Sequence, residues 1–145
     1  MKSFRTLVLA AMTALLPFGV QAQEKALKVL VHVTTGADNP TKAALAFLVA
    51  KTAADEGHQV TIFLAGDGAE LITDRSLNAV EGRGTGKLRE SYDALVAKGT
   101  RILISGGSAK ARGIAETDIA GKPAQFATPN ALVKLVAESD RVITY

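Results

Sequence analysis

Short apolar segments alternate with helical segments along most of this chain, and this alternation restricts the fold more than any other feature. Lys28–Thr34 and Gln59–Ala65 are rich in β-branched residues and apolar on both faces, which is typical of buried parallel strands. Between them, Asn39 as N-cap and Pro40 at the first helical position begin a helix that we expect to reach about Glu56. Strands separated by helices favour crossover connections and a parallel sheet.

The second half of the chain repeats the pattern. We expect three more strands, over Arg101–Ser105, Gln125–Ala127 and Arg141–Tyr145, and three more helices, over Ala69–Thr73, Gly86–Ala97 and Pro129–Ser139. Residues 74–85 are polar and contain glycine, and we expect a loop there. The sequence therefore predicts an α/β protein: a single doubly wound, flavodoxin-like, mostly parallel sheet with helices on both faces.

The N-terminus has the three parts of a secretory signal. Lys2 and Arg5 precede an apolar run over residues 6–16, and Val20-Gln21-Ala22 has compact residues where signal peptidase reads. A membrane anchor is the alternative, but the run is too short for a hydrocarbon core that takes ~20 residues to cross.

We therefore predict that residues 1–22 are a cleaved signal peptide and that residues 23–145 form the single working domain. If the source is a Gram-negative bacterium, the destination is the periplasm. No membrane association is expected after cleavage.

Charge and composition argue against several classes of function. The chain has 17 basic and 14 acidic residues, and loss of Lys2 and Arg5 leaves 15 basic residues against 14 acidic ones. This balance and the low aromatic content, 5%, do not favour nucleic-acid binding. The chain contains no cysteine, so thiol, persulfide and Cys/His zinc chemistry are excluded, and we expect no cofactor and no metal.

The candidate binding site follows from the expected sheet, because ligands of such sheets bind beyond the carboxyl ends of the strands. These ends are residues 34–39, 66–68 and 105–108. In the turn 105–110, glycine N–H groups, two hydroxyls and a lysine would suit a small anion; a purely structural turn is the alternative. The predicted ligand-binding residues are His32, Thr35, Asn39, Ser105, Gly106, Gly107, Ser108 and Lys110.

Two catalytic interpretations of glycine-containing segments fit poorly. A nucleophile elbow needs glycine two residues before and two residues after the serine, and neither Ser105 nor Ser108 has both. A serine hydrolase with His32 as base remains an alternative, although no orienting carboxylate is identifiable. Gly84-Thr85-Gly86-Lys87 is similar to part of a phosphate loop, but it lacks the earlier glycine and the hydroxyl residue after the lysine.

Several segments together resemble the DsrE/DsrF-like family of small sulfur-relay proteins, over nearly all of the chain after the signal. They are Val29-Leu30-Val31-His32, Asn39-Pro40, Val60-Thr61-Ile62-Phe63-Leu64 with Gly66-Asp67, the run from Ser105 to Gly113, and Asp140 to Tyr145. The resemblance implies the fold, homo-oligomers such as trimers or hexamers, and a loose link to sulfur metabolism.

The resemblance also implies that sulfur-carrying members have a cysteine in the turn that corresponds to Ser105–Ser108. A serine oxygen cannot hold transferable sulfane sulfur, so that activity does not extend to this chain. The leading hypothesis is a non-catalytic binding or assembly module with no catalytic residue. The second is a sulfur-relay accessory that binds a sulfur species or oxyanion non-covalently at Ser105–Lys110. The third is a serine-dependent or metal-assisted enzyme.

Overall fold

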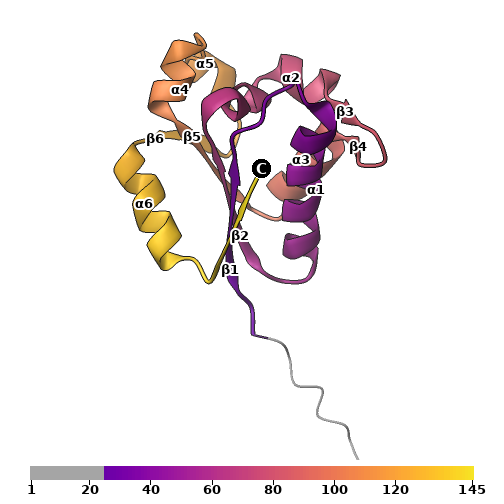
Figure 1. The fold of residues 1–145 in the computed structure, drawn as a ribbon, viewed down its shortest axis with the longest axis vertical. Coiled ribbons are helices and arrows are strands. Elements are labelled where there is room, and N and C mark those ends of the chain that lie inside the picture. The colour runs from indigo at the N-terminus through magenta and orange to yellow at the C-terminus, as the bar shows by residue number, and fades with distance from the viewer. Residues whose placement is uncertain (1–24) are drawn as a thin grey trace, which may run out of the picture.

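A parallel sheet of five strands is the centre of the computed structural model, which describes residues 25–145 (Figure 1). The spatial order of the strands is β6-β5-β2-β1-β7. Their bounds are β1 Lys28–Val33, β2 Gln59–Leu64, β5 Arg101–Ser105, β6 Ala124–Ala127 and β7 Arg141–Thr144. The predicted α/β class with a mostly parallel sheet is confirmed. The predicted signal peptide lies outside the described residues.

Helix α1 (Pro40–Asp55) begins where local signals predict it. The Asn39 side chain accepts a hydrogen bond of 3.2 Å from the backbone N–H of Lys42, and Pro40 occupies the first helical position. Gly57, with φ of +87°, turns the chain out of the helix towards β2.

The connection from β2 to β5 differs from the expectation in three places. The helix predicted over Ala69–Thr73 is instead a longer 3₁₀ helix, η1 (Gly66–Ile72). The loop predicted over residues 74–85 is wrong: it contains helix α2 (Asp74–Ala79) and strand β3 (Glu81–Gly82).

Side-chain capping and backbone conformation explain these corrections. The Thr73 hydroxyl caps α2 by accepting from the Ser76 N–H at 3.3 Å. Strand β3 pairs in an antiparallel hairpin with β4 (Gly86–Lys87), and Gly86 has φ of +74°, which no helix contains. Helix α3 (Leu88–Ala97) therefore starts two residues later than predicted.

The last two connections are helical as well. Helix α4 (Gly106–Ala111) starts directly at the glycine turn after β5, and a four-residue helix, α5 (Glu116–Ile119), precedes β6. Helix α6 (Pro129–Glu138) joins β6 to β7, close to the predicted bounds. Within residues 25–145, none of the helices combines the length and the apolar character that crossing a bilayer demands.

The two faces of the sheet are covered unequally. Crossovers from β1 to β2, β5 and β6 all run in one direction, so their right-handedness puts the connecting helices on one face. The return to β7, on the far side of β1, reverses direction and puts α6 alone on the other face (Figure 1). The larger core lies under α1 and α3, whereas the smaller one consists of Leu30, Phe63, Leu103 and Leu135 with a few partly buried neighbours.

Candidate functional site

The change of face between α4 and α6 locates the crevice of the sheet. The chain leaves β5 towards α4 on the larger-core side, and it leaves β6 towards α6 on the opposite side. Doubly wound sheets bind ligands at this switch point, outside the carboxyl ends of the two strands. The predicted turn 105–110 lies at this point, since β5 ends at Ser105 and α4 begins at Gly106.

Both serine hydroxyls of the turn are engaged in hydrogen bonds within the protein. The Ser105 hydroxyl caps α4 by accepting from the Ser108 N–H at 3.4 Å. The Ser108 hydroxyl accepts at 2.9 Å from the backbone N–H of Gly66, which follows β2. These bonds tie the end of β5 to the end of β2, so the turn has a structural role whatever it binds.

Arg112 extends this connection across the same edge. Its guanidinium donates to the Ser108 carbonyl at 3.2 Å and forms an ion pair with Asp67 of η1. Lys110, by contrast, is exposed and has no carboxylate within 4 Å among residues 25–145. It lines a cavity of about 290 Å³ together with Gly106, Ala109, Ile114 and Phe126.

The end of β1 is joined to this edge through η1. The Gly68 N–H donates to the Thr34 carbonyl at 3.1 Å, and a Cβ on Gly68 would come within 2.4 Å of the Val33 carbonyl oxygen. Only glycine permits this approach. Thr35 lies in the loop after β1, whereas the Asn39 side chain is occupied as the cap of α1. The structure therefore gives Asn39 a structural role.

His32 points to the other face of the sheet. It belongs to β1, alternates with the larger-core residues Val31 and Val33, and stands edge-on to Phe63 with ring centroids 5.9 Å apart. Its Nε2 is buried and has no hydrogen-bond partner in the described part of the chain. Burial lowers the pKa of His32, so the neutral form is favoured.

A second cavity of about 410 Å³ at the same edge was not predicted from the sequence. Glu70, Arg75 and Arg112 are among its lining residues, with the buried Ser76 hydroxyl and Asp118. One oxygen of Glu70 accepts from the Ala37 N–H at 2.7 Å, which anchors the loop after β1. Glu70 falls within the helix predicted over Ala69–Thr73, whereas the other missed residues lie in the segment interpreted as loop or beyond the turn. No local pattern marks them as parts of one site.

Two kinds of catalytic group are relevant to this edge among residues 25–145: a serine bonded to a histidine or carboxylate, and a metal-ligand group. Neither serine hydroxyl of the turn forms a hydrogen bond with a histidine or a carboxylate between residues 25 and 145. The same part of the chain holds no group of three metal-ligating side chains from His, Cys, Asp or Glu. Exposed cations lie beside glycine-containing backbone at this edge.

The model of the DsrE/DsrF-like family matches residues 27–145. The chain belongs to this family. The resemblance predicted from the sequence is thus confirmed over every element described above.

Solved structures of two proteins share the fold of this DsrE/DsrF-like chain. The YchN protein from E. coli has 17% sequence identity and a TM-score of 0.67, and the match covers 83% of this chain and 100% of YchN. A conserved protein of unknown function, BT1422, from Bacteroides thetaiotaomicron has 14% identity and a TM-score of 0.56, covering 81% and 94%. A comparison with curated proteins found no match.

Proposed function

We propose that this DsrE/DsrF-like protein is a non-catalytic binding or assembly module, loosely linked to sulfur metabolism and exported from the cytoplasm. One observation carries the proposal. The turn that would present a sulfur-carrying cysteine holds serines instead, and both hydroxyls are engaged in structural hydrogen bonds. The fold of the family is thus kept while its reactive group is missing.

Mass spectrometry of the intact protein tests whether it accepts sulfur covalently. The wild-type protein, incubated with thiosulfate as the sulfane-sulfur donor and a sulfurtransferase, is expected to keep its mass, because it has no thiol. The Ser108→Cys variant places a thiol at the same position and serves as the matched control. It is expected to gain one sulfur atom as a persulfide, with sulfite released from thiosulfate. A stable gain of sulfur by the wild-type protein would contradict the proposal.

A second candidate is non-covalent binding of a sulfur species or oxyanion at the Ser105–Lys110 turn. The cavity beside α4 supports it, as does Lys110, which has no ion-pair partner within residues 25–145. Calorimetric titration with thiosulfate, sulfate and phosphate is the test. Lys110→Gln should weaken binding about tenfold, or ~1.4 kcal/mol, whereas Lys87→Gln, at an exposed position of β4, should not. If none of the three anions produces heat, this candidate is wrong.

Assembly with further copies of the chain is supported by where apolar side chains remain exposed. In the described residues, the exposed large apolar side chains are Val133 and Val136 of α6 and Val142 of β7. They lie on the side of the sheet that α6 covers alone. Helix α1, although it is apolar, contributes none of them.

We expect a trimer or hexamer by light scattering at micromolar concentration. Replacing both Val133 and Val136 with lysine should shift the protein towards monomers, because charge on an apolar contact opposes its desolvation. Thr52→Lys, on the exposed side of α1, is the control and should leave the mass unchanged. A monomeric wild-type protein would contradict the assembly proposal.

A further inference from the structure

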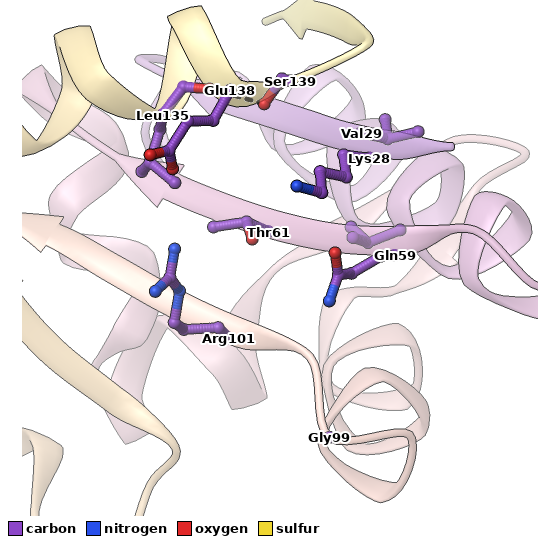
Figure 2. A pocket seen from close by; sticks show the side chains of 10 residues that line it. Lys28, Val29, Gln59, Thr61, Gly99, Arg101, Leu135, Glu138 and Ser139 are labelled. Atoms are coloured by element: carbon purple, nitrogen blue, oxygen red, sulfur yellow. Dashed lines mark hydrogen bonds between the residues drawn. The ribbon is translucent and has the colours of Figure 1, made fainter. Parts of the chain in front are cut away.

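A cavity of about 290 Å³ lies at the opposite edge of the sheet from the turn, next to the C-terminal end of α6 (Figure 2). Its floor comes from residues that begin three neighbouring strands: Lys28 of β1, Gln59 of β2 and Arg101 of β5. Leu135, Glu138 and Ser139 form the side contributed by α6 and its end. The family resemblance assigns no role to this cavity.

The strand register brings two cations to this floor. Lys28 is paired with Gln59, and Thr61, two residues further along β2, is paired with Arg101. Neighbouring strands lie ~4.8 Å apart, so the strands of Lys28 and Arg101 are separated by about 10 Å across β2. Figure 2 shows both side chains reaching towards the space above Thr61, and Glu138 reaching towards it from α6.

The three charged groups are not neutralised by one another. Within residues 25–145, no carboxylate lies within 4 Å of the Lys28 ammonium or the Arg101 guanidinium. The Glu138 carboxylate has Lys134, at 3.7 Å on its own helix, as its ion-pair partner. Two positive groups and one negative group therefore face a shared space without forming ion pairs with one another.

We propose that this cavity binds a small zwitterion of the α-amino-acid type. The carboxylate of the ligand lies between Lys28 and Arg101, where the planar guanidinium donates two parallel hydrogen bonds. Its ammonium group lies towards Glu138 and the last carbonyls of α6, whose dipole favours positive charge. Leu135 supplies an apolar surface for a short side chain.

The combination of charges selects this class of ligand over simpler ions. A plain anion would be attracted by Lys28 and Arg101 but repelled by Glu138 and by the negative end of the α6 dipole. A plain cation would be attracted by Glu138 and the α6 dipole but repelled by Lys28 and Arg101. The volume is sufficient for one small metabolite.

The test is calorimetric titration of the purified protein with a panel of proteinogenic α-amino acids that includes L-alanine and L-serine. Propionate and ethylamine, each with one of the two charged groups of alanine, are the half-ligand controls. At least one amino acid should bind, and neither half-ligand should bind as tightly as the amino acid. Arg101→Gln and Glu138→Gln should each weaken binding about tenfold, as expected for losing one charge-assisted contact.

Matched variants separate local effects from changes in total charge. Arg83→Gln and Glu116→Gln remove the same charges at exposed positions outside this cavity and should leave the affinity within about twofold of wild type. Circular dichroism verifies that each variant is folded; if Arg101→Gln is not, Lys28→Gln takes its place. The proposal is overturned if no amino acid binds at millimolar concentration, if propionate binds as tightly as alanine, or if Glu138→Gln leaves the affinity unchanged. An ion pair formed by Glu138 closing onto Arg101 would produce the first result.

Discussion

Replacing Ser108 with alanine removes the hydrogen bond that joins the end of β2 to the start of α4. The Ser108 hydroxyl accepts from the Gly66 N–H at 2.9 Å, and the two residues are 42 positions apart in the chain. The bond is partly buried, so the freed N–H is only partly rehydrated. A net hydrogen bond contributes about 0.5–1.5 kcal/mol, and an unpaired buried donor adds about 1–3 kcal/mol of cost.

Two adjustments bring the expected magnitude to the lower part of this range. Water reaches a partly buried N–H and reduces the cost of leaving it unpaired. Alanine is also the better helix former, which returns about 0.5 kcal/mol in α4. We therefore expect the free energy of unfolding to fall by about 1 kcal/mol, or ~3–6 °C in Tm for a domain of this size.

Urea unfolding followed by circular dichroism measures this difference, with an unchanged m-value as the sign that only stability has altered. Thr117→Ala, at an exposed position of α5 without a side-chain hydrogen bond, is the matched control and should change stability by less than about 0.5 kcal/mol. Ser105→Ala breaks a longer bond of 3.4 Å and should cost less than Ser108→Ala. If Ser108→Ala is as stable as Thr117→Ala, the structural role assigned to the Ser108 hydroxyl is wrong.

Three further predictions follow from other parts of the molecule. Gly68→Ala should prevent folding or lower the free energy of unfolding by more than about 3 kcal/mol in thermal unfolding, because its Cβ would collide with the Val33 backbone. Gly107→Ala has open space around its Cβ and should be neutral or stabilising. Equal effects of the two substitutions would refute the argument. Burial lowers the pKa of His32 below its unfolded value near 6.5, so the unfolded chain binds more protons and the free energy of unfolding should fall as the pH drops below ~6.5. His32→Phe should lose this part of the pH dependence. Identical pH profiles for the wild type and the variant would contradict the prediction. The exported protein should begin at or within a residue or two of Gln23, and N-terminal sequencing that finds Met1 would show that no signal is removed.

Local chemistry explains which parts of the fold were predictable. The strands at Lys28, Gln59 and Arg101 combine β-branched composition with short length, and these properties are visible in a window of a few residues. The start of α1 was equally visible, because Asn39 and Pro40 satisfy its first turn without help from distant residues. The hairpin over residues 81–87 was missed because it is held by a contact with α1, where the Arg83 N–H donates to the Thr41 hydroxyl at 3.1 Å. Helix α2 did have a local signal, the Thr73 cap, which the interpretation as loop overlooked.

The candidate site was predictable only in outline. Placing it at the carboxyl ends of the strands needs no more than the order of strands and helices, and the turn after β5 indeed lies at the switch point. The hydrogen bond from the Gly66 N–H to the Ser108 hydroxyl was not predictable, because it depends on how closely two loops approach each other. His32 was grouped with the turn, but alternation along β1 turns its side chain towards Phe63 on the α6 face.

The sequence by itself determined the class of fold, the family resemblance and the absence of thiol chemistry, because each follows from residue identity and order. The tertiary structure alone decided which face α6 covers, because the handedness of crossovers acts only once the strands are placed in order. It also decided that Lys28, Arg101 and Glu138 share one cavity. Charged residues far apart in the sequence come together only through strand register and helix packing, and no local sequence pattern encodes that they will be neighbours.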